Sequence, residues 1–327
     1  MLPFSRAGCK HQLRLKAFGH EILLLIDNLR IAEILTGVFA SRYFAPGGQE
    51  PEFRFYCSTQ CTAGWDMAMD CAGSIFVCRA SGNTALTFDR FLWAPAAVTV
   101  EGTFSANENY APSLDTTLEL FATQFQHRFL EKLLSLKPSM RLIHSASLAC
   151  NGCGVLLLGS TRGGKSTLAL AGVLEGMQFL SDDFSTIDIE RSLIHPFPRA
   201  LRLRKASCDL IPEFTSLCAG TTVDVRGETR FYMHPETIRP DALESGPVRI
   251  SHIFRLASFS DQPEISPASA ASIAVDCMKA DVFDHGRKAL DLMWQWAGLA
   301  DGVTCLDLKV GSPAETARLL RLFLEQT

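Results

Sequence analysis

The chain has 327 residues, of which 47% are hydrophobic and 20% are charged, and its formal net charge is −4. A chain of this length usually forms more than one domain, and this hydrophobic content is enough for two cores. The slight acidic excess, without a run of basic residues, argues against a nucleic-acid partner. No apolar stretch reaches the about 18 residues that a membrane helix needs, so we expect no membrane partner.

The first residues lack an apolar segment that ends in a small-residue cleavage site, so the sequence predicts a cytoplasmic protein. The 11 cysteines are odd in number and irregularly spaced, which favours free thiols. Cys150 and Cys153 have the spacing of zinc and redox pairs, but Asn151-Gly152 between them is a strong hairpin signal. A hairpin is the favoured interpretation, and metal or redox chemistry is the alternative.

Residues 1–135 are predicted to form a separate, strand-rich α+β domain. Antiparallel strands are indicated by short apolar or alternating runs at 53–57, 74–78, 84–88 and 97–100. A long helix follows, in which apolar residues recur every three or four positions from Leu114 to Leu133. Pro138 marks its end. A stripe of this kind is typical of core packing, and this half of the chain carries no recognisable chemistry.

Residues 139–327 are predicted to form an α/β domain. Strands are expected at 141–150, 154–158 and 179–181, a helix at 165–175, and a loop at 257–273, which is rich in Ser, Pro and Ala. Gly176 stands just after the first helix, where a left-handed residue is favoured. Ser312-Pro-Ala-Glu315 combines an N-cap, a first-turn proline and a capping-box glutamate, which predicts a terminal helix to about Glu325.

A phosphate-binding loop is predicted at Gly159 to Ser166, which reads Gly-Ser-Thr-Arg-Gly-Gly-Lys-Ser. Glycines allow successive backbone N–H groups to point at phosphate oxygens, and the following helix directs its positive dipole end at the same anion. Lys165 adds a positive charge for the β- and γ-phosphates, and the Ser166 hydroxyl can bind Mg²⁺. The expected nucleotide contacts are Gly159, Ser160, Thr161, Arg162, Gly163, Gly164, Lys165, Ser166 and Thr167.

Two adjacent acids, Asp182 and Asp183, follow the next predicted strand. The carboxyl ends of strands in α/β sheets face the crevice in which ligands bind. Because neighbouring carboxylates repel each other, we expect one to bind Mg²⁺ and the other to accept a hydroxyl proton. A turn in which both aspartates cap backbone N–H groups is the structural alternative. His144, on the predicted strand 141–150, is by itself a candidate core residue.

These residues together resemble the catalytic domain of HPr serine kinase/phosphorylase and of related kinases, among them the lasso-peptide kinases of peptide gene clusters. The resemblance rests on Ile143-His144, the loop, Phe179-Leu-Ser-Asp-Asp and Pro196-Phe-Pro-Arg-Ala-Leu-Arg-Leu. It implies the fold shared with phosphoenolpyruvate carboxykinase, the use of ATP and Mg²⁺, and phosphoryl transfer to a serine hydroxyl. It also implies Asp183 as base, Asp182 as a Mg²⁺ ligand with Ser166, and His144 as their neighbour.

The acceptor stays open between a peptide, a protein and a small molecule, because the Arg-Gly-Leu-Gly-Ile signature of true HPr kinases is reduced to Arg226-Gly227. The expected partners are thus a nucleoside triphosphate and a hydroxyl acceptor, and the sequence is compatible with a homo-oligomer. A nucleotide-binding regulator or ATPase without kinase activity is the competing hypothesis.

Overall fold

The computed structural model describes side chains and backbone at 10–18, 20–26, 29–39, 134, 137, 139–197, 199–211, 231–244, 246–282 and 289–326, with a few side chains inside these ranges excepted, and backbone alone at 53–57, 67–71, 74–81, 85–92, 101–105, 222–225 and 228–230. In these ranges no helix is long and apolar enough to cross a membrane. The chain folds into two compact units, Met1–Lys132 with Val223–Thr229, and Leu133–Thr222 with Arg230–Thr327. Because 223–229 groups with the first unit, the predicted division into residues 1–135 and 139–327 stays a prediction.

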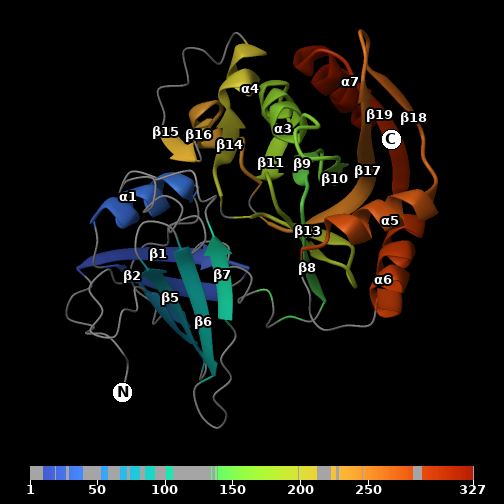
Figure 1. Cartoon of the computed structure of the whole chain (residues 1–327). Coiled ribbons are helices and arrows are strands. Elements are labelled where there is room, and N and C mark those ends of the chain that lie inside the picture. Colours follow the sequence, from blue (N-terminus) through green and yellow to red (C-terminus); the bar gives the residue numbers. More distant parts are fainter. Residues whose placement is uncertain are drawn as a thin grey trace. The chain divides into compact units, whose positions relative to one another are not determined.

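The first unit holds a seven-stranded sheet in which the strands lie in chain order (Figure 1). Its strands are β1 His11–Ala17, β2 His20–Ile26, β3 Phe53–Cys57, β4 Met67–Cys71, β5 Ser74–Ser81, β6 Ala85–Leu92 and β7 Glu101–Ser105. All neighbours are antiparallel except β2 and β3. A parallel pair requires a crossover, and the helix α1 Leu29–Val38 lies in this connection and packs on β1 and β2.

The predicted strands at 53–57, 74–78 and 84–88 are confirmed, and the last two extend further along the chain. The predicted strand at 97–100 and the helix at 114–133 lie outside the described residues. The structure therefore tests the strand-rich character of this unit but not the long helix.

The second unit contains a nine-stranded mixed sheet in the order β11-β9-β10-β17-β13-β12-β8, with β19 beside β17 and β18 beside β19. Its strands are β8 Met140–Ile143, β9 Ala146–Cys150, β10 Cys153–Leu158, β11 Gln178–Ser181, β12 Ser185–Asp188, β13 Leu193–His195, β17 Val248–Phe259, β18 Glu264–Pro267 and β19 Thr304–Val310. β10, β17 and β19 are parallel. β11 and β10 are each antiparallel to β9, so β11 also runs parallel to β10.

A smaller sheet, β14-β16-β15, is formed by β14 Leu201–Arg204, β16 Glu228–Met233 and β15 Thr222–Val225. The helices of the second unit are α3 Lys165–Leu174, α4 Lys205–Asp209, η4 Pro235–Thr237, α5 Ala270–Ala280, α6 Ala289–Asp301 and α7 Pro313–Glu325. α3 ends as predicted, because Gly176 adopts a φ of 101°. α7 also begins as predicted, since the Ser312 side chain accepts a hydrogen bond from the amide of Glu315.

Helices cover both faces of the large sheet. α3 and α7 lie next to each other and contact β9, whereas α5 and α6 form a second pair that contacts β10 and β19 (Figure 1). Successive residues of a strand face opposite sides, so Leu156 and Leu158 of β10 reach the core that holds Ile273 and Trp296 of the second helix pair. Val155 and Leu157, which alternate with them, are buried on the opposite face of the strand. A strand covered on both faces is continuously apolar, as the predicted strand at 154–158 is.

The hairpin β9–β10 is confirmed. Asn151 and Gly152 have φ values of 50° and 78°, the two positive values that a type I′ turn requires. Cys150 and Cys153 stand directly opposite each other in the ladder, and both are free thiols. Across the described residues no group of three or more His, Cys, Asp or Glu side chains could hold a metal ion.

Two predictions about local structure are wrong. The expected strand 141–150 is two strands, because the chain leaves the sheet at His144 and Ser145, and the His144 amide bonds to the carbonyl of Ala280 at 2.7 Å. The expected loop at 257–273 is the end of β17, all of β18 and the start of α5. β18 pairs with β19, some 40 residues away in the chain, and no local pattern predicts such a partner.

Candidate functional site

The predicted phosphate-binding loop connects β10 to α3. It closes on itself, because the Gly163 amide donates a hydrogen bond of 3.0 Å to the carbonyl of Ser160. A side chain on Gly163 would place its Cβ 3.0 Å from that same oxygen, which is closer than most Cβ contacts, so the tight turn favours glycine. Gly164, the residue before α3, has a φ of 89°, which is also costly for other residues. The glycines thus have conformational reasons for their positions.

The described loop leaves its outer residues open to solvent. Ser160, Thr161 and Arg162 are exposed, and Arg162 adopts a left-handed φ of 66°. Gly159, Gly163 and Gly164 are half-buried, and the Thr167 hydroxyl donates to Ser207 of α4 at 2.9 Å. The side chain of Thr167 is therefore engaged within the protein, and a contact with a nucleotide would come from its backbone in the first turn of α3.

Lys165 lies almost fully buried beneath the loop. Its Nζ donates to the carbonyl oxygens of Gly159 at 2.7 Å and Ser160 at 3.0 Å. Burial lowers the pKa of Lys165, although the nearby charges of Asp182 and Asp183 oppose this effect. The ammonium group is held by two neutral carbonyls, and an anion above the loop would be a stronger partner.

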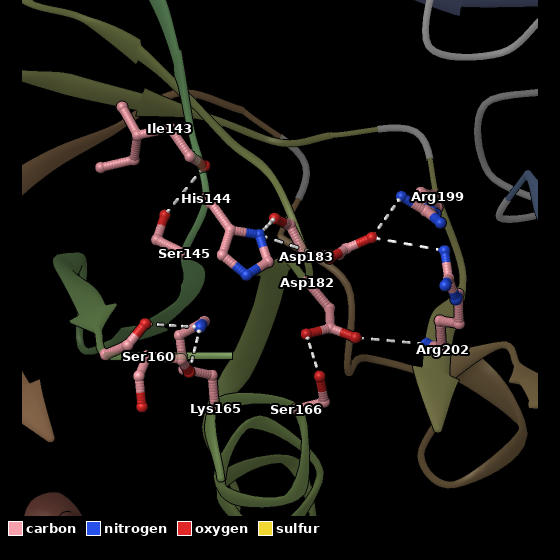
Figure 2. Close-up of polar contacts among 11 residues, drawn as sticks. Ile143, His144, Ser145, Ser160, Lys165, Ser166, Asp182, Asp183, Arg199 and Arg202 are labelled. Atoms are coloured by element: carbon pink, nitrogen blue, oxygen red, sulfur yellow. Dashed lines mark hydrogen bonds and ion pairs between the residues drawn. The ribbon is translucent and has the colours of Figure 1, made fainter. Parts of the chain in front are cut away.

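Ser166 and Asp182 connect α3 to the end of β11. The Ser166 hydroxyl donates to Oδ1 of Asp182 at 2.7 Å, and the backbone amide of Arg202 donates to Oδ2 at 3.2 Å (Figure 2). Asp182 is only 1% exposed. Burial, followed by the charge of Asp183, raises the pKa of Asp182, and the two hydrogen bonds only partly offset this.

These two residues fit a magnesium ion. A buried carboxylate whose charge is poorly compensated is stabilised by a cation, and a hydroxyl oxygen lies beside it. Mg²⁺ is commonly held by only one or two carboxylates, completed by water and substrate phosphates. The lack of a larger ligand cluster among the described residues is compatible with such a site.

Asp183 points away from Asp182 and has a different environment. Its φ of 68° turns the chain sharply after the first acid. Oδ2 contacts the guanidinium groups of Arg199 at 3.1 Å and Arg202 at 3.5 Å, and the side chain remains 25% exposed (Figure 2). One acid is thus buried against α3, while the next is solvent-accessible and stabilised as an anion by two arginines.

His144 lies on the other side of Asp183. Its Nδ1 is 2.8 Å from the backbone oxygen of Asp183 and 3.4 Å from Oδ1 (Figure 2). A carbonyl oxygen only accepts hydrogen bonds, so Nδ1 carries the proton in this arrangement. The imidazole is one-third exposed and packs edge-on against the ring of Phe184. The break between β8 and β9 places the histidine here rather than in the core.

Arg199 and Arg202 are site residues that the sequence analysis quoted in a motif without assigning them a role. Arg199 is completely buried, and its guanidinium also lies 6.0 Å from the centre of the Phe184 ring. Burial alone would lower the pKa of Arg199, but the charges of Asp183, Tyr232 and Asp182 outweigh it and raise the pKa. A buried arginine signals a nearby acid, yet the sequence does not reveal which residues are buried.

The predicted residues therefore converge at one edge of the sheet. β10 and β11 are parallel, so the loop and the two acids emerge at the same edge, and the break at His144 lies beside them. Behind the acids, three buried serines, Ser147, Ser181 and Ser185, form hydroxyl contacts of 2.5 and 2.7 Å that fix the end of β11. Residues 226–227, the remnant of the HPr kinase signature, lie outside the described residues.

Comparisons with known proteins do not show a family for this chain. No protein-family model matches the chain, and no curated protein matches it. Among solved structures, it is similar to the HPr(Ser) kinase/phosphatase from Coxiella burnetii, at 15% identity and a TM-score of 0.29. The match covers 57% of this chain and 99% of that chain. A likeness of this extent establishes no function, so the proposal below rests on the geometry of the site.

Proposed function

We propose that this protein is a kinase that uses Mg·ATP to phosphorylate a serine-type hydroxyl of a peptide, a protein or a small molecule. The observation that carries the proposal is the placement of Lys165, the Ser166–Asp182 pair and the partly exposed Asp183 at one edge of the sheet. Phosphoryl transfer requires that the phosphate and the acceptor be positioned, that the charge on the phosphates be neutralised, and that a group take the hydroxyl proton. This edge offers all three.

The phosphate groups would bind over the loop. The amides of residues 160–166 and the positive end of α3 favour an anion there, and Lys165 can exchange its two carbonyl partners for phosphate oxygens. Ser166 and Asp182 would hold Mg²⁺, which supplies neutralisation of the charge on the β- and γ-phosphates. The buried carboxylate of Asp182 would then have a cation beside it.

The acceptor hydroxyl would be activated by Asp183. The carboxylate of Asp183, which is partly exposed, would take the hydroxyl proton as the acceptor oxygen attacks the γ-phosphorus. The bond between that phosphorus and the β–γ bridging oxygen breaks, and ADP leaves. His144, which bonds to the backbone of Asp183, would orient this turn and face the acceptor.

The cellular location that we propose is the cytoplasm. Five cysteines of the described chain are free thiols, which supports a reducing compartment such as the cytoplasm.

A regulator or ATPase would use the same phosphate site without an acceptor. The position of Asp183, near two arginines and a histidine but accessible to solvent, favours a kinase, because a hydroxyl acceptor could reach it.

Two measurements on the purified full-length protein test this function. Calorimetric titration with Mg·ATP should show saturable binding, and incubation with γ-labelled ATP should label a hydroxyl acceptor. Candidate acceptors are the products of neighbouring genes, such as a short precursor peptide or a phosphotransferase carrier, and mass spectrometry would locate the added phosphate. Binding and hydrolysis without transfer to any such acceptor would favour the ATPase, and folded protein that does not bind Mg·ATP would exclude both functions.

A further inference from the structure

Phe259 is a large aromatic side chain that the fold leaves in solvent. It is the last residue of β17, and it is 68% exposed. Ile253 and Phe254 in the middle of this strand are fully buried, Leu256 is half-buried, and the strand is exposed from Ala257 to its end. An exposed aromatic ring at a strand end gains nothing from the core of the protein. Its position beside the phosphate-binding loop suggests a role in binding.

The ring lies directly against the loop. A Cβ built on Gly164 would stand 3.6 and 3.7 Å from two carbon atoms of the Phe259 ring, which is ordinary van der Waals contact. Farther back on β17, the Cβ of Leu256 would be 3.2 Å from a Cβ on Gly159, the first residue of the loop. β17 therefore follows the loop from its beginning to the start of α3 and ends in the exposed ring.

The sheet order places Phe259 and the two acids on opposite sides of the loop. β17 is the neighbour of β10 on one side, while β9 and then β11, which carries Asp182 and Asp183, lie on the other. The three strands β11, β10 and β17 are parallel, so acids, loop and ring all emerge at the same edge. A triphosphate whose γ-phosphate faced the acids could therefore extend its nucleoside end toward β17.

We propose that Phe259 is the platform on which the nucleobase of the bound nucleotide stacks. This inference rests on the proposed function, because it requires that the loop bind a nucleoside triphosphate. The described ring offers a π-face of the kind on which bases stack without regard to their hydrogen-bonding pattern. Phe259 therefore contributes affinity for a nucleotide over a simple polyphosphate, and it discriminates weakly between purines.

The test compares a ligand that has a base with one that lacks it. Calorimetric titration of Phe259→Ala should show Mg·ATP binding weakened about tenfold, the usual effect of losing one base–aromatic stack, while Mg·tripolyphosphate binds as to the wild type. Phe259→Trp should restore Mg·ATP binding. Trp294→Ala is the matched control, because Trp294 is an aromatic residue 69% exposed on α6, and it should leave both affinities unchanged.

A second readout follows the ring itself. The fluorescence of the Phe259→Trp variant, after subtraction of the wild-type signal, should be quenched by Mg·ATP and not by Mg·tripolyphosphate. Equal loss of both ligands in Phe259→Ala would overturn the inference and assign the ring to the loop's structure. Wild-type affinity for Mg·ATP in that variant would overturn it too and leave the proposed function intact. A wild-type protein that binds neither ligand would remove the proposed function itself.

Discussion

The hydroxyl of Ser166 donates a hydrogen bond of 2.7 Å to Oδ1 of Asp182, and this contact joins the first turn of α3 to the end of β11. The two residues are the predicted magnesium ligands. Because they already touch, the metal site needs little rearrangement, and the cost of ordering its ligands is low. The charged groups around this contact are therefore the side chains whose replacement should change nucleotide binding, phosphoryl transfer or stability.

Lys165→Ala should weaken Mg·ATP binding by about 30-fold or more, because hydrogen bonds from a charged group are worth about 1.5–3 kcal/mol. Calorimetric titration measures the change. Lys205→Ala is the control, since its side chain is 75% exposed and pairs with Asp209 on the surface of α4. If the two variants bind equally well, the lysine of the loop does not contact the phosphates.

Asp183→Asn should lower the rate of phosphoryl transfer by about 10²–10⁴-fold, the usual contribution of a general base, and should keep Mg·ATP binding. The asparagine keeps the shape of the side chain but cannot take up the proton. Single-turnover transfer and calorimetry separate the two effects. A variant that transfers phosphate at the wild-type rate would show that another group is the base.

Asp182→Asn should raise the Mg²⁺ concentration needed for half-maximal ATP binding by about tenfold, since replacing a carboxylate removes the negative charge that attracts the ion. The measurement is a Mg²⁺ titration at fixed ATP, beginning from chelator-treated protein. Asp241→Asn provides the comparison, because this side chain is 74% exposed and forms an ion pair with Arg239. An unchanged Mg²⁺ requirement in Asp182→Asn would place the ion elsewhere.

The raised pKa of Asp182 predicts a pH effect on stability. Folding favours the protonated acid, so its contribution is fully present below the unfolded pKa, which is 3.8, and is lost as the pH rises through the folded-state pKa. Without Mg²⁺, the Tm of Asp182→Asn should therefore increase relative to that of the wild type as the pH rises from about 4 to about 7. Thermal scans across this range, with and without Mg·ATP, would show it.

Near neutral pH, Mg·ATP should raise the Tm of the wild type above that of Asp182→Asn. The reason is that a ligand that binds the folded wild type more tightly stabilises it more. Parallel stability curves for the two proteins at every pH would contradict the assignment of this carboxylate as a destabilising buried charge.

Arg199→Met should lower the free energy of unfolding by about 2 kcal/mol, the usual contribution of a hydrogen bond between charged groups, because Asp183 is partly exposed and keeps Arg202. Asp183 would lose its closest cation, and the turn that presents it would be less ordered. Arg191→Met should cost less than about 1 kcal/mol, because that side chain is 78% exposed and 4.0 Å from Asp188. Urea denaturation compares them, and equal losses would mean that Arg199 is not a stabilising partner of the acid.

The sequence by itself determined the features that depend on a few neighbouring residues. The Asn151-Gly152 hairpin, the strand–loop–helix at 154–174, the left-handed Gly176 and the capping of α7 by Ser312 were all predicted correctly, because positive φ values, helix caps and apolar periodicity are properties of short segments. The loop and both acids were also placed at strand ends. Their meeting at one edge follows from the parallel strands.

Only the tertiary structure decided which acid is buried and which is accessible, since both are aspartates in one turn and their difference comes from α3 and β14. It also brought Arg199 and Arg202 to Asp183, moved His144 out of the predicted strand, and converted the expected loop at 257–273 into β17, β18 and α5, with Phe259 at the phosphate loop. Each of these depends on strand pairing or burial between residues far apart in the chain, from Asp183 and Arg199, 16 positions apart, to Gly164 and Phe259, which are much farther apart. Contacts at such separations are fixed by the packing of the whole unit, and local residue patterns carry no record of them.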